Sequence, residues 1–420
     1  MAYVASKMRD AGYDVTLNPF PFVYVALPKL VQTAPTAATY ESGAYTGTGY
    51  GTVTAAVTGV DLSLAPPRTS TSGCEAADFA GFPAGSIALV QRGACSFAIK
   101  AINAEAAGAS AVIIFNQGNT PDREDLIVGT LGGTNVVAIP VVGASFAQGV
   151  ALAEPGSMAM IQIDPPQNIT LHNVIAESRS GDANNVVMVG AHLDSVNRGP
   201  GIQDNGSGSA AILETALQMA KVKPRNKLRF AWWGAEEAGL VGSTAYVNGL
   251  SEAEQQKIAL YLNFDMVGSP NHVFFIYDGD DSDGVGAGPG PDGSAYIEQV
   301  FENYYIERGL PFKGTDFSGR SDYGPFIAIG IPSGGLFTGA EGIKTAEEAA
   351  LFGGTAGDAY DPCYHLACDT FDNISLSALD ANADAIAYST LLFSMNTQAI
   401  NGKRGKGNFK YPAYKFLETE

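Results

Sequence analysis

Five side chains of the types that bind zinc stand in short glycine-rich or strand-edge motifs, namely His192, Asp204, Glu237, Asp265 and His365. Zn²⁺ accepts both imidazole nitrogens and carboxylate oxygens. Another carboxylate, Glu236, directly precedes one of the five and is available to carry a proton beside bound ions. The residue types therefore predict a hydrolase that works with two zinc ions.

Three of these motifs follow apolar runs that have the pattern of strands. The runs are residues 186–190, 228–234 and 260–264, and His192, the Glu236–Glu237 pair and Asp265 come soon after them. Helical patterns over residues 207–220 and 239–248 alternate with the strands. This alternation predicts an α/β fold, with a mostly parallel twisted sheet, helices on both faces and ligands at the carboxyl ends of the strands.

The local sequence around the acids leaves alternatives open. Asp194 lies two residues after His192 on the same side of an extended chain, so we expect its carboxylate to accept the imidazole N–H. Asp204 lies in a glycine-rich loop that opens a helix, where it can bridge two ions, although a helix-capping aspartate would explain the same composition. Glu236 and Glu237 point in different directions, as a base and a ligand require, but such a pair can also be a solvated helix start.

The four cysteines pair naturally by their spacing, Cys74 with Cys95 and Cys363 with Cys368. The second bridge would stiffen the loop that holds His365. Two local bridges fit an oxidising compartment, so we expect a secreted protein, extracellular or periplasmic. Residues 1–12 already have the pattern of an amphipathic helix, and we expect a leader to have been removed ahead of them.

These motifs, in this order, resemble the secreted di-zinc aminopeptidases of peptidase clan MH, the bacterial leucine aminopeptidase type, over residues 165–400. The resemblance implies that Asp204 bridges the two ions, that His192 and Asp265 complete one shell, and that Glu237 and His365 complete the other. It also implies a cis peptide bond after Asp204. The remaining roles that it implies are a general acid and base at Glu236, oxyanion stabilisation by Tyr364, and substrate contacts at Arg320 and Phe337.

One departure from that family concerns the free amine of the substrate. Relatives carry several acids just before the Gly-Arg-Ser-Asp motif that starts at Gly319, whereas this chain has only Asp316 there. Asp316 is therefore our candidate for amine recognition. Some relatives use a longer N-terminal region, together with acids like Asp380 and Asp384, to bind calcium. That region does not precede the opening helix in this sequence, and calcium is the second cofactor that we consider.

A separate compositional block covers residues 50–163, with strand patterns over 51–60, 86–90, 111–115 and 136–142 and a helical pattern over 98–108. Its Cys74-to-Phe79 segment, the Gln91-Arg92-Gly93 motif and the run from Ala111 to Asn116 resemble the protease-associated (PA) domain, a non-catalytic lid that shapes substrate access. The alternative is an insert without a role in selectivity. We predict a peptidase domain over residues 1–33 and 164–400, a PA domain over 34–163 and a basic tail over 401–420.

Composition limits the partners. The hydrophobic fraction of 46% and the charged fraction of 16% predict a globular chain, and no apolar run approaches the roughly 20 residues of a membrane span. A net charge of −19 argues against nucleic acid and anionic membranes. We expect a monomer that acts on peptide or protein N-termini.

Two further segments have ambiguous roles. The insertion over residues 278–293, with Asp278, Asp280, Asp281 and Asp283, could be a calcium loop, but its ligand spacing is irregular and a mobile acidic surface loop is the simpler interpretation. The tail over 401–420 is either a removable segment that covers the acidic cleft or a disordered end.

The prediction is thus a metallo-aminopeptidase that removes large hydrophobic N-terminal residues such as Leu. A metallocarboxypeptidase of the same fold would need basic side chains to clamp a terminal carboxylate, and beyond Arg320 the sequence offers none in an evident motif. A catalytically inactive peptide-binding homologue would have lost a ligand or the base, and all six positions are intact.

Overall fold

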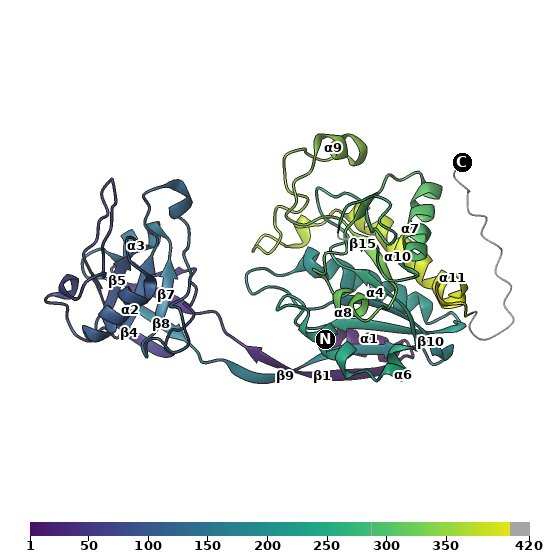
Figure 1. The fold of residues 1–420 in the computed structure, drawn as a ribbon, viewed down its shortest axis with the longest axis horizontal. Coiled ribbons are helices and arrows are strands. Elements are labelled where there is room, and N and C mark those ends of the chain that lie inside the picture. Colours follow the sequence, from purple (N-terminus) through teal and green to yellow (C-terminus); the bar gives the residue numbers. More distant parts are fainter. Residues whose placement is uncertain (287, 404–420) are drawn as a thin grey trace. The chain divides into compact units, whose positions relative to one another are not determined.

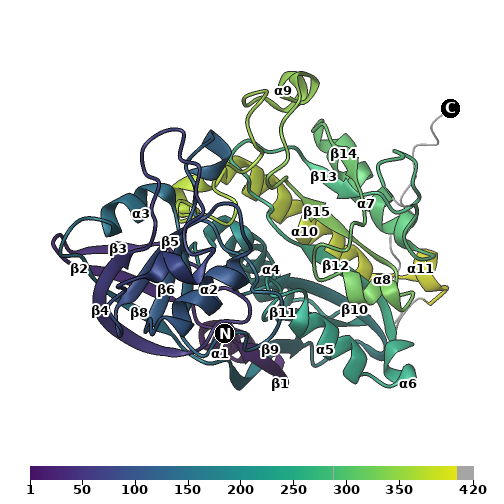
Figure 2. The same ribbon diagram turned by 60° about the vertical axis from the view of Figure 1, so that its left-hand side comes forward.

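The structure, a computed structural model, describes residues 1–286 and 288–403 of the 420-residue chain. Most of the predicted basic tail, from residue 404 onward, lies outside the described residues. The chain forms two compact units (Figure 1, Figure 2). We call them the α/β unit, which comprises Met1–Phe22 and the chain from Thr170 onward, and the inserted unit, Val23–Ile169.

An eight-stranded sheet with the order β1-β9-β11-β10-β12-β15-β13-β14 forms the centre of the α/β unit. Its strands are β1 (Asp14–Tyr24), β9 (Gln167–Glu177), β10 (Asp182–His192), β11 (Asn226–Trp233), β12 (Ile258–Phe264), β13 (Phe275–Tyr277), β14 (Lys313–Thr315) and β15 (Ser333–Phe337). The central strands β11, β10, β12 and β15 are parallel, whereas β9 and β13 are antiparallel to their neighbours β11 and β15. The predicted α/β fold with a parallel centre is confirmed.

Helices cover both faces of this sheet. The first face packs against α1 (Ala2–Asp10), α4 (Gly208–Met219), α7 (Ser294–Arg308) and α10 (Leu376–Met395), and the second against α5 (Val241–Gly249) and α8 (Gly324–Ala328). Figure 1 shows α4, α7 and α10 grouped together beside the sheet. Shorter helices are α6 (Glu252–Gln255), α9 (Ala346–Phe352) and α11 (Gln398–Asn401). Helix α7 and the strands after β12 were not predicted from the sequence.

Strand β12 shows how alternation assigns side chains to the two faces. Leu260, Leu262 and Phe264 belong to the core of the first face, whereas Tyr261 belongs to the core of the second. The next residues with the parity of Tyr261 are Asn263 and Asp265, because successive side chains of a strand point to opposite faces. The second face of β12 therefore leads directly to a predicted metal ligand.

The inserted unit has a seven-stranded sheet with the order β3-β2-β8-β4-β5-β6-β7. Its elements are β2 (Lys29–Ala34), β3 (Ala38–Tyr40), β4 (Gly51–Gly59), β5 (Ile87–Gln91), α2 (Phe97–Ala106), β6 (Ala111–Phe115), β7 (Val141–Ala144), α3 (Phe146–Leu152) and β8 (Met158–Ile163). Strands β2 and β3 pair antiparallel within this sheet. Sequence inspection also missed β8 and α3.

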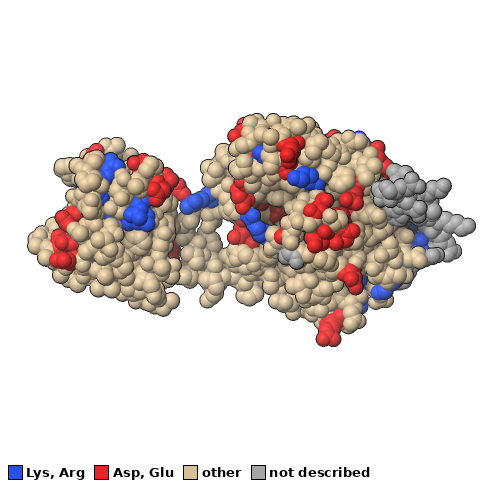
Figure 3. Space-filling view, turned by 45° about the horizontal axis from the view of Figure 1, so that its top comes forward, with Lys and Arg blue, Asp and Glu red and all other residues tan. Residues whose placement is uncertain are grey.

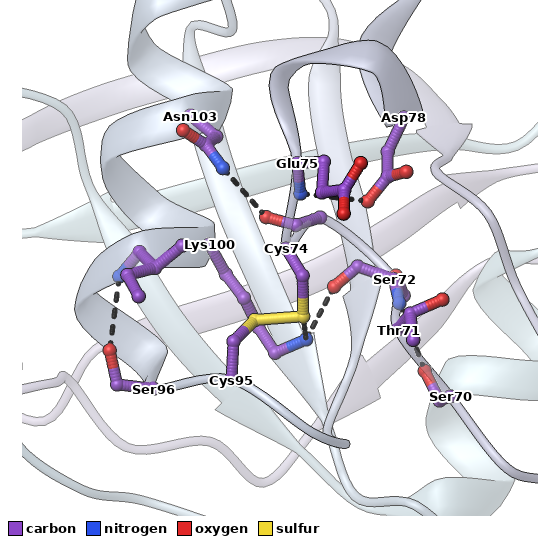
Figure 4. The surroundings of a disulfide bond; sticks show 12 residues. Ser70, Thr71, Ser72, Cys74, Glu75, Asp78, Cys95, Ser96, Lys100 and Asn103 are labelled. Carbon is purple, nitrogen blue, oxygen red and sulfur yellow. Dashed lines mark hydrogen bonds between the residues drawn. A yellow bond between two sulfur atoms is a disulfide. The ribbon is translucent and has the colours of Figure 1, made fainter.

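A disulfide joins Cys74 to Cys95 in the inserted unit, as the spacing predicted. Beside it lies the fully buried Lys100, whose ammonium nitrogen is 3.7 Å from Cys74 Sγ and donates a hydrogen bond to the carbonyl oxygen of Ser72 (Figure 4). Asn103, one turn further along α2, donates to the Gly73 carbonyl at 3.1 Å. The bridge and these two side chains fasten α2 to the segment that precedes η1 (Ala76–Phe79).

Candidate metal centre and pocket

Five segments of the α/β unit bring the predicted ligands together. His192 ends β10, Glu237 follows β11 and Asp265 follows β12, and these three strands are neighbours in the sheet. Asp204 lies in the irregular helical turn η3 (Ile202–Ser207) before α4, and His365 lies in the loop before α10. Parallel strands end at the same sheet edge, which is why residues far apart in sequence meet there.

The donor atoms form two groups that share Asp204. In the first group, His192 Nε2 is 3.2 Å from Asp204 Oδ1 and 3.1 Å from Asp265 Oδ1. In the second, His365 Nε2 is 3.2 Å from Asp204 Oδ2 and 2.9 Å from Glu237 Oε2. The two oxygens of Asp204 therefore face different groups, as a bridging carboxylate requires.

These distances fit zinc. Ligands about 2.0–2.2 Å from one ion and at tetrahedral angles are about 3.3 Å apart. One buried atom in the second group, Glu237 Oε1, makes no hydrogen bond. A buried polar atom without a partner is costly, so this observation favours a cation between the donors.

The charge of the site leads to the same conclusion. Burial raises the pKa of Glu236 to about 10, and Asp265 adds to this shift although His192 opposes it. Burial and the neighbouring Asp204 raise the pKa of Glu237 to about 7. Gathering carboxylates at a buried edge is unfavourable unless cations offset their charge. Figure 3 shows further Asp and Glu side chains in groups on the surface of this unit.

Hydrogen bonds fix the loop that carries Asp204. The carboxylate of Asp369 accepts from the backbone N–H groups of Gln203, at 2.8 Å, and Asp204, at 3.1 Å. Asn205 donates to the carbonyl of Phe264 at the end of β12, at 3.0 Å. The peptide bond between Asp204 and Asn205 is cis, as the family resemblance implied.

The role predicted for the Asp194 carboxylate was wrong in one respect. His192 Nδ1 lies 3.1 Å from the backbone carbonyl of Asp194 and 3.9 Å from its carboxylate. The carboxylate instead accepts from the backbone N–H groups of Glu236, at 3.0 Å, and Glu237, at 3.3 Å. The turn after β11 presents two N–H groups that attract the carboxylate. The backbone carbonyl of Asp194 is then left as the hydrogen-bond partner of the imidazole. Asp194 still orients both the histidine and the glutamate pair.

The loop of His365 is closed by a disulfide between Cys363 and Cys368. At its start, Asp361 Oδ1 accepts from the backbone N–H of Cys363 at 2.9 Å. The ring of Tyr364 stacks on that of His365, with centroids 3.8 Å apart. The bridge and the stack hold the predicted ligand and the predicted oxyanion donor in one rigid segment.

A pocket of about 530 Å³, part of it open to solvent, adjoins the two donor groups. Glu236, Tyr364, Asp316, Arg320 and Phe337 all line it, so every predicted substrate contact lies on one cavity. The other lining residues are Asp204, Glu237, Asp265, Met266, Tyr277, Thr315, Ser318, Ser321, Tyr323 and Ala340.

Arg320 is the only basic residue among those lining residues, and it is engaged by an acid. Its guanidinium donates to Glu341 Oε1 at 2.8 Å and lies 3.4 Å from the hydroxyl oxygen of Tyr364. Burial raises the pKa of Tyr364 well above its usual range, although Arg320 opposes this, so the phenol keeps its proton. Sequence inspection missed Glu341, and nothing local in the sequence distinguishes it from an ordinary surface acid.

The acidic residues outside the two donor groups do not support the predicted calcium site on α10. Asp384 lies 4.0 Å from the guanidinium of Arg308, and Asp380 and Asp384 are exposed. In the 278–293 insertion, Asp278 and Asp280 approach Glu298 of α7. Calcium binding stays a prediction.

Among the described residues, no helix is both long and apolar enough to cross a membrane.

Comparison with known proteins gives consistent matches. Residues 173–390 match the model of peptidase family M28, and residues 57–152 match that of the PA domain. The chain is 54% identical over 410 residues to a protein named aminopeptidase from Pseudomonas aeruginosa (strain UCBPP-PA14), covering 95% of this chain and 76% of that protein. It is 47% identical over 364 residues to leucine aminopeptidase 2 of Trichophyton rubrum, covering 82% and 72%. The fold is similar to that of BSAP, a zinc aminopeptidase from Bacillus subtilis, with a TM-score of 0.60 and 28% identity over 92% of this chain and 86% of that one.

Proposed function

We propose that this chain, which belongs to peptidase family M28 and carries a PA domain, is a zinc aminopeptidase that removes large hydrophobic residues from peptide N-termini. The observation that carries the proposal is the pair of donor groups that share Asp204, with Glu236 in the adjoining pocket. The names of the relatives support N-terminal cleavage, and those of the fungal relatives support a preference for leucine.

We assign one ion to His192, Asp204 and Asp265 and the other to His365, Asp204 and Glu237. Two zinc ions held there would supply Lewis acidity and lower the pKa of a water molecule. Glu236 belongs to neither group but lines the same pocket. It would accept a proton from the attacking water and return it to the leaving amine.

Tyr364 would donate its phenolic hydrogen to the oxyanion that develops on the scissile carbonyl. Its raised pKa keeps that hydrogen in place at neutral pH. Arg320, held by Glu341, lies close enough to orient the phenol. These groups stabilise charge that appears only during the reaction, which is why they accelerate it.

The charge of the pocket favours an amine over a carboxylate at the substrate terminus. Asp316 lines it without belonging to either donor group, and its one basic residue is already paired. An α-ammonium group would be attracted there, whereas the terminal carboxylate that a carboxypeptidase must bind would be repelled. The Phe337 and Tyr277 rings offer apolar surface for a Leu side chain.

We also propose that the protein is secreted and that it acts as a monomer. The two disulfides support an oxidising compartment. For the inserted unit we propose the role of a PA domain that restricts substrate access to the α/β unit.

Hydrolysis of Leu-p-nitroanilide and of its N-acetylated form, each with and without a chelator, tests the proposal. We expect rapid hydrolysis of the free-amine substrate only, loss of activity with chelator, and recovery on addition of zinc. Hydrolysis of the acetylated substrate at a similar rate would overturn the aminopeptidase assignment. Activity that survives complete removal of metal would overturn the metal mechanism.

A further inference from the structure

A chain of buried hydrogen bonds extends from the metal centre into the second face of the sheet. Ser321 Oγ donates to Asp265 Oδ2 at 2.6 Å, and Asn263 Nδ2 donates to Ser321 Oγ at 2.9 Å. Tyr261 Oη donates to Asn263 Oδ1 at 2.9 Å, and Trp233 Nε1 donates to Tyr261 Oη at 2.8 Å. Four consecutive hydrogen bonds thus connect the Trp233 indole to Asp265.

We propose that Trp233, Tyr261 and Asn263 are positioning residues that aim one oxygen of Asp265 at the first zinc ion. This inference rests on the proposed function and adds residues that lie behind the metal centre. Asp265 Oδ2 accepts a hydrogen bond from Ser321, whereas Oδ1 lies 3.1 Å from His192 Nε2. The chain therefore determines which carboxylate oxygen is available to the ion.

The direction of the chain follows from its first member. An indole N–H can only donate, so Tyr261 Oη must accept from Trp233 and must send its own hydrogen to the other side. Asn263 Oδ1 receives that hydrogen, and the amide nitrogen is left to donate to Ser321. The hydroxyl hydrogen of Ser321 then has Asp265 as its acceptor. A donor-only group at the far end thus fixes the polarity of every bond up to the carboxylate.

Burial makes this arrangement persistent. Trp233 and Tyr261 are fully buried, and Asn263 is 1% exposed, so water cannot replace a lost partner. The ring of Phe326, from α8, stacks on Tyr261 with centroids 4.0 Å apart and planes within 5°. Burial also raises the pKa of Tyr261 well above its usual range, which keeps the phenolic hydrogen available to Asn263.

The strand between Trp233 and Tyr261 is shaped to let them meet. Trp233 lies on β11 and Tyr261 on β12, with β10 between these two strands. The residue of β10 beneath the indole–phenol contact is Gly190. A Cβ at this position would collide with Tyr261 Oη and would lie 2.7 Å from Trp233 Nε1. Glycine is therefore required here by the hydrogen bond that crosses above it.

Tyr261→Phe tests the inference, with Tyr13→Phe as the matched control. Tyr13 is also buried in the α/β unit, and its hydroxyl donates one hydrogen bond, to the Ala216 carbonyl at 2.7 Å, away from the chain described here. Zinc affinity is measured on the whole protein by competition with a chromogenic chelator. The unfolding midpoint of the metal-free protein is recorded for each variant.

We expect Tyr261→Phe to weaken one of the two zinc-binding steps about threefold to tenfold. This loss of affinity is smaller than the loss expected for a residue that hydrogen-bonds a metal ligand directly, because Tyr261 acts through two intervening residues. Tyr13→Phe should lower the unfolding midpoint similarly and leave both zinc affinities unchanged. If Tyr261→Phe does not fold, Trp233→Phe removes the donor and keeps most of the ring, and a smaller loss at the same step is expected.

The inference would be overturned if Tyr261→Phe bound zinc as tightly as the control Tyr13→Phe; where Trp233→Phe replaces Tyr261→Phe, the same comparison applies to it. Either result would leave the proposed function intact. Equal weakening of both binding steps would also overturn it, because a general structural role would act on both. A wild-type protein that binds no zinc would overturn the proposed function and, with it, this inference.

Discussion

The buried Lys100 of the inserted unit leads to a quantitative prediction about stability and pH (Figure 4). Burial lowers its pKa from 10.5 to about 8, although Asp78 and Asp61 oppose the shift. Between pH 8 and pH 10.5 the unfolded chain therefore holds a proton that the folded unit has released. Stability rises with pH wherever the unfolded state binds more protons, so the inserted unit should become more stable across this window.

The magnitude follows from the two pKa values. A pKa difference of one corresponds to about 1.4 kcal/mol, so the folded inserted unit gains roughly 3 kcal/mol between pH 8 and pH 10.5. Below pH 8 the lysine is charged in both states, and the full cost of burying the ammonium is present. Lys100→Met cannot titrate, so the difference in stability between wild type and variant should change by this amount over the window.

Amide hydrogen exchange of β5 and β6 measures this difference in the inserted unit. Wild type and variant are compared at the same pH, which cancels the intrinsic pH dependence of exchange. We expect the ratio of their exchange rates to change about 100-fold between pH 8 and pH 10.5. Both tryptophans, Trp232 and Trp233, lie in the α/β unit, so their fluorescence should report no such difference. A ratio that stays constant with pH would refute the reasoning.

Three other changes test the site. Glu236→Gln should lower kcat for Leu-p-nitroanilide by about 10²–10⁴-fold, because it removes the proton carrier. The amount of bound zinc should not change, because Glu236 is not a metal ligand, and a loss of zinc on metal analysis would contradict this. Replacing Cys363 and Cys368 together by Ser should lower stability by roughly 2 kcal/mol in urea unfolding, because the bridge closes a loop with a sequence separation of 5. It should also weaken one zinc-binding step, and unchanged zinc affinity would show that the bridge does not position His365. Phe337→Ala should lower kcat/KM for Leu relative to Ala substrates about tenfold, and an unchanged ratio would place the side-chain pocket elsewhere.

Much of the site could be predicted because its residues follow recognisable strands. His192 and Asp265 directly end or follow buried, nearly uninterrupted apolar runs, the pattern of central parallel strands. Asp194 shows the limit of this reasoning. Spacing placed it near His192, but whether its carbonyl or its carboxylate makes the contact depended on the two N–H groups of the turn after β11.

Of the elements that were not predicted, one has a recognisable pattern in the sequence and the shortest have no local signal. Helix α7 carries Ile297, Phe301 and Tyr305 at helical spacing. This pattern predicts a helix directly after the glycine-rich insertion, so α7 could have been predicted. Strands β13 and β14 have only three residues each, too few for a periodic signal. Asp369 and Ser321 act through contacts to segments far away in sequence, which no local pattern indicates.

The alternation of side chains along β12 limits how this strand can evolve. Inserting or deleting one residue would exchange the two sets of side chains, turning Leu262 toward the aromatic face and Asn263 into the hydrocarbon core. The carboxylate at the strand end would lose its orientation in the same event. Length changes in β12 should therefore be strongly selected against, even where individual amino acids vary freely.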